Sequence, residues 1–483
     1  MKKRIISILC ALALCLGLLP ATAWAANTPV AYLTWSEEQS KLVTDTCDSY
    51  ISLNSSSNIS SLGTEGQQKW YVLKGNNSRR FRIEVKGDVH LILSNNCTLT
   101  AQQGIHVPDG SSLTIYAQSE NENEMGKLVA LSGDDYLTYR YCAVIGGNGT
   151  DTAGSITING GNITATGKSD SGAYGAAIGT GCYSTSGSTD STMAITINGG
   201  IVTAEATGGG AAIGTGYRTG GGTITINGGT INATSNGGGA AIGTGYTGNG
   251  GTISINGGTV QATSNNSGAA IGVGDSGILG TVNITGGQIT AAAYNKKGNP
   301  SNSGAAIGCG YFYETGGEIN ISGGTINITN GYQNGIGYGH YKSSASGSSS
   351  ITITITGGSI CNPYQMGGTP VNGSNAPVYK TNVDLSDVGG IAANQAVSGT
   401  IKDYSYGFDD VYIDANTCLY LYLPAGETTA TFGSQTFEGT VSAGDGNVLT
   451  ASNAAKAPVS YIDKTGAGYT TKYYTVVTDT TSA

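Results

Sequence analysis

The stretch Gly210-Ala-Ala-Ile-Gly-Thr-Gly-Tyr217 decides the fold, because it returns along the chain in nearly constant form. It is unchanged at 239–246, and it recurs with one or two substitutions at 175–182, 268–275 and 304–311. A more distant copy is Ala143-Val-Ile-Gly146. A repeat of this kind is typical of one structural unit stacked on itself.

Glycine-rich turns set the length of the repeat. Turns of the type Asn-Gly-Gly or Thr-Gly-Gly begin at Asn198, Asn227, Asn256 and Thr285, and each step between them is 29 residues. On either side of a turn apolar and polar residues alternate, as in Ile224-Thr-Ile226, and this period of two predicts strands. With the GAAIG segment, each repeat therefore contains three short strands.

Three strands per repeat predict an all-β protein with a parallel β-helix, which we expect to be right-handed. Successive coils would hydrogen-bond to one another at a spacing of about 4.8 Å, with Ile, Val and Ala stacked inside. The glycines permit tight corners, and the turn asparagines would bond to local backbone. A β-propeller is the alternative, but it requires four strands per roughly 40 residues.

The repeat pattern also divides the chain into segments. We expect a cap or linker at 26–65, the β-helix at 66–362, and a small β-sandwich-like C-terminal module at 376–445, where strands are longer and more aromatic. In the tail, 446–483, Pro458-Val-Ser-Tyr-Ile462 is similar to Pro29-Val-Ala-Tyr-Leu33. The tail thus resembles the start of a further module, although short strand sequences can also match by chance.

The N-terminus predicts export. Residues 1–25 have a basic start, an apolar run over Ile5–Leu19 and the cleavage site Ala23-Trp-Ala25, which together are typical of a signal peptide. The run is shorter than the roughly 20 apolar residues of a membrane span. Lipoprotein processing at Cys15 is an alternative, but Leu14 is larger than such a site prefers. We therefore expect a secreted or cell-surface-associated protein that is not inserted in a membrane after cleavage of the signal peptide.

Charge and cysteine content exclude several classes of function. The chain has 22 basic and 31 acidic residues, so removing the three basic residues of the signal peptide leaves a net charge of −12, which argues against nucleic acid as a partner. The seven cysteines after the signal are widely spaced without a CxxC, so neither a zinc site nor a dense disulfide framework is indicated.

No catalytic residue is predicted. The acidic residues between 155 and 360 are scattered over different repeat positions, whereas acid/base chemistry on glycans uses paired carboxylates. Motifs for nucleophilic triads, zinc proteases and nucleotide binding are absent from the sequence. We expect no cofactor. Asp409, Asp410 and Asp414 are candidate ligands of a calcium ion. A hairpin turn at 414–416 is the simpler explanation of Asp414.

The repeat aligns variable residues in columns beside the closing glycine of the GAAIG segment, where we expect side chains to project from the coil. Tyr is abundant, with 28 Tyr against 5 Phe, and its amphipathic ring suits contact with sugars. The alternative is a purely structural role, in which the rings only stack on one another and stabilise the corner. The candidate glycan-binding residues in these columns are Tyr183, Tyr217, Arg218, Tyr246, Asp275, Tyr311, Phe312, His340 and Tyr341.

Residues from about 80 to 360, with their NGG turns and GAAIG segments, resemble secreted β-helix proteins of Gram-positive gut bacteria that are often described as carbohydrate-binding-domain proteins. The stretch His90–Ala117, HLILSNNCTLTAQQGIHVPDGSSLTIYA, is similar to their first coils. More distantly, the fold resembles the pectate-lyase-like superfamily, where some non-catalytic relatives bind acidic plant polysaccharides with calcium. The clustered acids and catalytic basic residue of the lyases are missing here.

These observations favour a non-catalytic glycan-binding or adhesive surface protein whose partner is a plant or host polysaccharide. A polysaccharide lyase or glycoside hydrolase with acids near the insertions is the second hypothesis. A spacer in a multi-module surface protein is the third. The oligomeric state is left open by the sequence.

Overall fold

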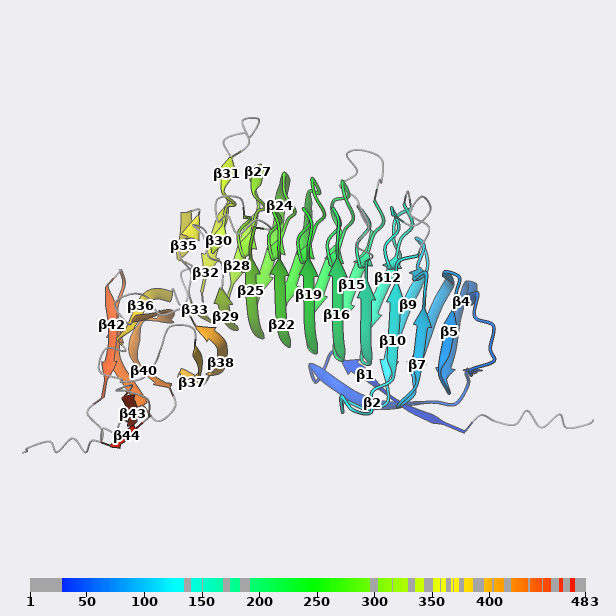
Figure 1. Ribbon diagram of the computed structural model, residues 1–483, viewed down its shortest axis with the longest axis horizontal. Coiled ribbons are helices and arrows are strands. Elements are labelled where there is room, and N and C mark those ends of the chain that lie inside the picture. The colour runs from blue at the N-terminus through cyan, green and yellow to red at the C-terminus, as the bar shows by residue number, and fades with distance from the viewer. Residues whose placement is uncertain are drawn as a thin grey trace, which may run out of the picture.

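The computed structural model is all-β in the residues it describes, which are 28–133, 140–149, 151–167, 174–182, 192–295, 303–314, 316–328, 335–342, 351–356, 358–361, 366–367, 369–372, 378–384, 395–401, 404–411, 418–432, 435–444, 446–452, 460–463 and 470–473. The expected signal peptide at 1–25 lies outside these residues. Parallel coils line up along one axis, with a hairpin along one edge of the first coils and a small sheet at the far end (Figure 1). The prediction of a parallel β-helix is confirmed.

One side of the helix is a ten-stranded parallel sheet made by the strands that follow the turns. Each strand pairs in register with its counterpart one coil away, so that Ile231 lies opposite Val202 and Val260. Its strands are β5 (Asn77–Arg79), β7 (Thr98–Ala101), β10 (Lys127–Leu131), β13 (Asn162–Thr166), β16 (Ile201–Ala206), β19 (Thr230–Ser235), β22 (Thr259–Ser264), β25 (Gln288–Ala293), β29 (Thr325–Ile328) and β33 (Ser359–Cys361).

The strands that precede the turns form a second parallel face, which begins with long strands in the first coils. Stacking starts at β3, so it begins within the range 26–65 that the sequence assigns to a cap. The strands of this face are β3 (Ile51–Leu53), β4 (Ser61–Leu73), β6 (Ile83–Leu93), β9 (Ser112–Ala117), β12 (Ser155–Ile158), β15 (Ala194–Ile197), β18 (Thr223–Ile226), β21 (Gly250–Ile255), β24 (Gly277–Ile284), β28 (Glu318–Ile321), β32 (Thr352–Ile355) and β35 (Thr369–Asn372).

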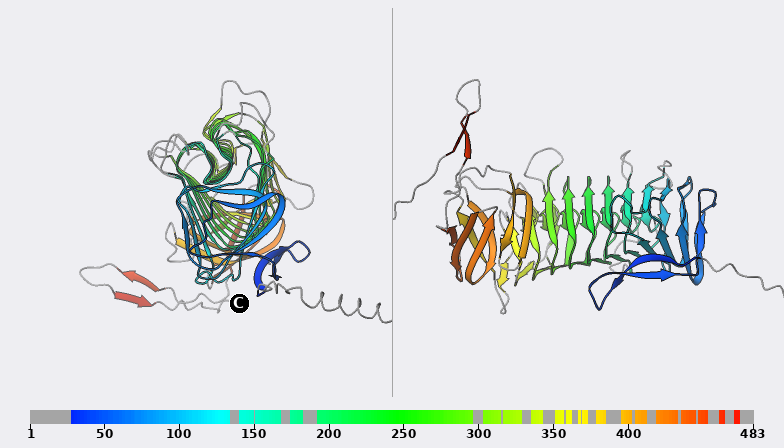
Figure 2. Two further views of the ribbon diagram at one scale, coloured as in Figure 1. Left: turned by 90° about the vertical axis from the view of Figure 1, so that its right-hand side faces the viewer. Right: turned by 90° about the horizontal axis from the view of Figure 1, so that it is seen from below.

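The GAAIG segments supply a third, very short strand in each coil, and seen along the axis the coils superimpose on one outline (Figure 2). These strands are β8 (Ile105–His106), β11 (Ile145–Gly146), β14 (Ile178–Gly179), β17 (Ile213–Gly214), β20 (Ile242–Gly243), β23 (Ile271–Gly272), β26 (Ile307–Gly308), β30 (Ile336–Gly337) and β34 (Met366–Gly367). Two further strands, β27 (Phe312–Glu314) and β31 (Tyr341–Lys342), extend the later coils at the same edge (Figure 1).

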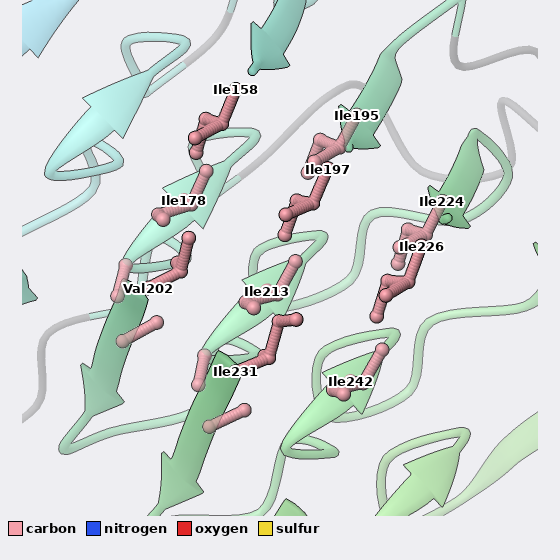
Figure 3. Close-up of a cluster of buried hydrophobic side chains, with 14 of the residues drawn as sticks. Ile158, Ile178, Ile195, Ile197, Val202, Ile213, Ile224, Ile226, Ile231 and Ile242 are labelled. Carbon is pink, nitrogen blue, oxygen red and sulfur yellow. The ribbon is translucent and has the colours of Figure 1, made fainter. Parts of the chain in front are cut away.

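Isoleucine columns fill the interior. Ile158, Ile197 and Ile226 lie one above another on successive coils, and each is fully buried (Figure 3). The alternation of the sequence produces this result, because successive strand residues point to opposite faces and the apolar set turns inward. Burial of these columns supplies the main stabilisation of the coils.

Asparagine columns follow the turns. The Asn198 Nδ2 donates to Asn159 Oδ1 at 2.7 Å, and Asn227 donates to Asn198 Oδ1 at 2.8 Å. The column continues through Asn256 at 2.9 Å and ends on Thr285 at 2.8 Å. Contrary to the expectation of local backbone bonds, the turn amides bond from coil to coil, which suits a group carrying both donors and an acceptor.

An antiparallel hairpin of β1 (Val30–Ser36) and β2 (Lys41–Cys47) lies across the outer face of the first coils (Figure 1). A second, smaller core forms beneath it from Tyr32, Val72, Ile92 and Tyr116, with Cys47 and Tyr50. The hairpin thus covers outward apolar residues of β4, β6 and β9.

The C-terminal module is a seven-stranded mixed sheet, in which β36 pairs in parallel with β42 and the other pairs are antiparallel. Its strands are β36 (Val378–Asp384), β37 (Gln395–Ile401), β38 (Tyr404–Val411), β39 (Cys418–Pro424), β40 (Gly426–Phe432), β41 (Gln435–Val441) and β42 (Asn447–Ala451). In the tail, β43 (Ser460–Asp463) and β44 (Thr470–Tyr473) form a separate antiparallel pair.

Candidate functional site

The corner formed by each GAAIGTG segment is closed by its own backbone and by a buried threonine. The amide of Ala211 donates to the carbonyl of Thr215 at 2.9 Å, which folds the segment into a tight loop. The Thr215 hydroxyl donates to the Thr219 carbonyl at 2.6 Å and accepts from the Gly245 amide of the next coil at 3.2 Å. Because the corner is satisfied internally, residue 217 is held at a fixed place on its edge.

Aromatic rings stack along this corner. The rings of Tyr217 and Tyr246 are stacked at 5.4 Å, and Tyr217 contacts Tyr174 at 5.2 Å in a tilted arrangement. Tyr174 in turn stacks on Tyr141 at 5.8 Å. All four rings are half-buried. We call Tyr141, Tyr174, Tyr217 and Tyr246 the tyrosine ladder.

Two arginine side chains lie against rings of the tyrosine ladder. The Arg140 Cζ lies 4.4 Å from the centre of the Tyr141 ring and 5.1 Å from that of Tyr174. The exposed Arg218 lies over the Tyr217 ring at 5.2 Å. Contacts of this kind are attractive because the ring face is electron-rich. The ladder therefore carries positive charge on an otherwise weakly charged helix.

A second stack follows two coils later. Tyr311 and His340 are stacked at 5.8 Å with nearly parallel planes, and both are half-buried. Phe312 meets Tyr311 edge-on at 4.5 Å and is 41% exposed, which makes it the most open ring of this corner among those whose exposure the structure describes. Tyr341 lies on β31, and Tyr183 lies outside the described residues.

Two members of the same column do not project, which corrects the expectation that every residue after the closing glycine would. Cys182 is fully buried, and burial raises the pKa of its thiol to about 12. Asp275 is also buried, and its Oδ1 accepts bonds from the Phe312 amide at 3.0 Å and the Ser276 hydroxyl at 3.1 Å. Asp275 therefore organises the corner of the next coil instead of facing a ligand.

The burial of Asp275 predicts a pH-dependent stability. Desolvation raises the pKa of this carboxyl above 3.8, although its hydrogen bonds oppose the shift. The folded chain then holds a proton that the unfolded chain has released, so this residue's contribution to stability falls as pH rises from about 4 through the raised pKa. Asp275→Asn keeps the Oδ1 acceptor and removes the charge. We expect its unfolding midpoint in urea, relative to the parent, to be higher at pH 7 than at about pH 4. An equal difference at both pH values would contradict this assignment.

The neighbouring column has an unusual backbone. Arg218, Thr247 and Ser276 have φ angles of 58°, 55° and 61°, a left-handed conformation that residues with a Cβ seldom adopt. The same turn recurs on three successive coils, so the side chain of Arg218 leaves the corner in a direction that the fold fixes. This is the basis for treating Arg218 as part of the corner surface.

Two of the aspartates considered for calcium lie on the C-terminal module. Asp409 and Asp410 are neighbours on β38, and Asp414 lies outside the described residues. Within the part of the chain that the structure describes, no group of three or more His, Cys, Asp or Glu side chains is placed to hold a metal ion. Among the same residues there is no helix with the length and hydropathy to cross a membrane.

Sequence reasoning missed the first half of the tyrosine ladder. Tyr141 and Tyr174 each stand four residues before the isoleucine of their segment, whereas Tyr217 and Tyr246 stand four residues after it. The two columns meet because the loop folds back, as the bond from the Tyr217 amide to the Tyr174 carbonyl at 2.7 Å shows. A search for columns on both sides of the isoleucine would have found Tyr141 and Tyr174.

Comparison with known families agrees with this geometry. Five consecutive segments match the family model described as Beta helix repeat, at residues 156–182, 195–217, 224–246, 253–274 and 282–311. The chain is a parallel β-helix protein. No curated protein and no solved structure matches it. The matched segments contain the strands before and after the turn together with the corner, and they include Tyr174, Tyr217 and Tyr246 of the ladder.

Proposed function

We propose that this parallel β-helix protein is a non-catalytic, secreted or cell-surface protein that binds a plant or host glycan along its aromatic corner. The observation that carries the proposal is the row of half-buried rings with guanidinium groups beside it, repeated at the spacing of the coils. Such a row offers a chain-like ligand aromatic contacts on successive coils.

The stacking defines how a glycan would be contacted. Because Tyr217 is stacked on Tyr246 and tilted against Tyr174, those ring faces are largely used within the ladder. The ring edges, the polar hydroxyl ends and the Arg218 guanidinium are then the contact groups, and Phe312 adds a more open ring. A guanidinium group beside the rings favours glycans that carry carboxylate or sulfate groups.

The carboxylates support binding over hydrolysis. Asp275 is the acid of the corner columns, and it is buried and hydrogen-bonded to the backbone of the next coil's corner. Glycosidases use two carboxyl groups on either side of the scissile bond. Release of reducing ends or unsaturated sugars from a broad polysaccharide panel would favour the lyase or hydrolase alternative.

A triple substitution tests the binding surface. We expect Tyr217→Ala, Tyr246→Ala and Tyr311→Ala together to weaken binding at least tenfold, because each removes a ring from the contact row. Binding is measured by a glycan array and by affinity electrophoresis with mucin and plant polysaccharides. Tyr294→Ala is the matched control, since Tyr294 is 45% exposed and lies beyond the end of β25. Unchanged affinity in the triple variant would refute the corner as the binding surface.

The same assay tests whether glycan binding depends on calcium. We propose that no cofactor is needed at the corner, so binding there should be equal with calcium and with EDTA. If binding requires calcium and is lost in Asp409→Ala with Asp410→Ala, the ligand is held at the C-terminal module and the corner is not the site.

A further inference from the structure

A cleft of about 690 Å³ lies between the hairpin and the first coils, where the range that the sequence assigns to a cap meets the start of its β-helix range. Its volume falls within the roughly 300–1,000 Å³ of small-molecule sites. The lining includes the rings of Tyr32, Tyr50 and Trp70 and the polar groups of Asp48, Gln68 and Lys69. In Figure 1 the hairpin lies at one edge of the coils, while β27 and β31 mark the aromatic corner at the opposite edge.

Trp70 is held rigidly in this cleft. Its ring is stacked on His90 with a centroid distance of 4.2 Å and an interplanar angle of 17°. His90 is fixed in turn by the Tyr116 hydroxyl at 2.7 Å and by Asp88 at 3.1 Å. Tyr32 packs against Trp70 at 5.1 Å in a tilted arrangement. A binding ring that is already immobile loses little entropy when a ligand arrives.

Tyr50 is a buried residue that directly precedes β3, and its side chain is also held in place. The pairing of Ile51 with Tyr71 places Tyr50 beside Trp70 in the coil register. The Tyr50 hydroxyl accepts from the Lys74 Nζ at 2.6 Å and donates to the Thr28 carbonyl at 3.0 Å. The Lys74 ammonium also lies 4.6 Å from the centre of the Tyr50 ring. The cleft therefore has two preset aromatic walls, one on β4 and one directly before β3.

The polar lining selects the class of ligand. Gln68 is exposed and its Nε2 contacts Asp88 Oδ2 at 3.1 Å, so its amide is oriented. Asp48 and Lys69 contribute one charge of each sign, which gives no net preference for an anionic ligand. Apolar ring faces combined with oriented amide and charged groups match a sugar ring, whose C–H face is apolar and whose rim carries hydroxyls.

We propose that this cleft is a second binding site, which takes one neutral pyranose unit, as at the end of a glycan chain. The site is built from residues of the hairpin and of β3 and β4, so it does not rest on the function proposed for the aromatic corner. Trp70 and Tyr50 supply the walls, and Gln68 Oε1 and the Asp48 carboxylate accept hydrogen bonds from hydroxyls at the rim.

Tryptophan fluorescence gives a reporter inside the cleft. The chain has three tryptophans, Trp24, Trp35 and Trp70, so Trp24→Phe with Trp35→Phe leaves Trp70 alone. The Trp35 indole N–H is buried without a hydrogen-bond partner, so the change to Phe breaks no such bond. In this double variant we expect a saturable change of Trp70 emission on titration with glucose, galactose, xylose, N-acetylglucosamine or cellobiose.

Variants at the rim separate a binding role from a structural one. Gln68→Ala and Asp48→Ala alter exposed residues, and we expect each to raise the apparent Kd for the best sugar about tenfold while the far-ultraviolet circular dichroism stays unchanged. A change in emission that survives both substitutions would overturn the site. So would the absence of any response across the neutral sugars, and tighter binding of glucuronic acid than of glucose would overturn the neutral assignment.

The two sites fail independently. If polysaccharide binding is lost in the variant lacking Tyr217, Tyr246 and Tyr311 but no sugar perturbs Trp70, the cleft proposal is wrong and the corner stands. If sugars perturb Trp70 with equal affinity in the parent and in the triple variant, the cleft proposal holds whatever the result at the corner.

Discussion

Gly243→Ala is expected to lower the free energy of unfolding by about 2–6 kcal/mol. Gly243 has a φ of 138°, and a Cβ added there would overlap the carbonyl oxygen of Gly272, its partner on the next coil. A non-glycine residue in such a conformation costs about 1–3 kcal/mol. Relieving the overlap means separating two coils that bond through Thr244 N and the Gly272 carbonyl at 3.1 Å, which adds about 1–3 kcal/mol as in other overpacked sites.

Gly250→Ala is the matched control for this prediction. Gly250 also has a positive φ, of 71°, but a Cβ added there would meet nothing within 4 Å. Only the cost of placing a residue with a Cβ in the left-handed backbone conformation remains, which is about 1–2 kcal/mol. Urea unfolding followed by circular dichroism compares the two variants at equal protein concentration. Equal losses of stability in the two variants would show that the close contact between Gly243 and Gly272 adds nothing to the cost of the substitution.

The columns of the helix could be predicted from the sequence because they depend only on period. Alternation of two places Ile197 and Ile226 inside whatever the exact corner geometry, and a constant step of 29 residues brings equivalent residues into register. The sequence predicts the pairing of the C-terminal strands less precisely, since no repeat fixes their partners. Their arrangement in one mixed sheet comes from long-range pairing that local pattern does not encode.

The hairpin and its cleft could not be predicted by period, but one signal was present. The run Leu91-Ile92-Leu93 is apolar without alternation, and in the structure Ile92 faces the hairpin while Leu91 and Leu93 face the main core. A continuous apolar run of this length is typical of a strand covered on both faces. It indicates that something docks on the outer face of the first coils, although not which segment does so.

The corner residues show the other limit of sequence reasoning. Tyr217 and Tyr246 lie at the corner surface in their predicted column, but Asp275 in the same column turns inward, because the Phe312 amide of the following coil needs an acceptor. A column therefore predicts position on the coil. The direction of a polar side chain depends on which backbone groups its neighbours leave unsatisfied.

Ile226→Ala is expected to lower the free energy of unfolding by about 2–5 kcal/mol. Ile226 is fully buried between Ile197 and Ile255 in the central column. Removing three carbons leaves a cavity that the neighbouring coils, fixed by backbone bonds on both sides, cannot collapse to fill. In a stacked repeat each coil contacts chiefly its neighbours, so the loss of stability should be largest near the substituted coil.

Thr225→Ala separates burial from strand propensity, because Thr225 is the adjacent residue of β18 and points outward. We expect it to cost less than about 1 kcal/mol, since it removes β-branching but no core volume. Hydrogen exchange adds the spatial test: amide protection in β15 and β21, which flank β18, should fall in Ile226→Ala while β7 keeps its protection. Uniform loss of protection along the whole helix would mean that the coils unfold as one cooperative unit, and stability would then be a property of the full stack rather than of neighbouring pairs.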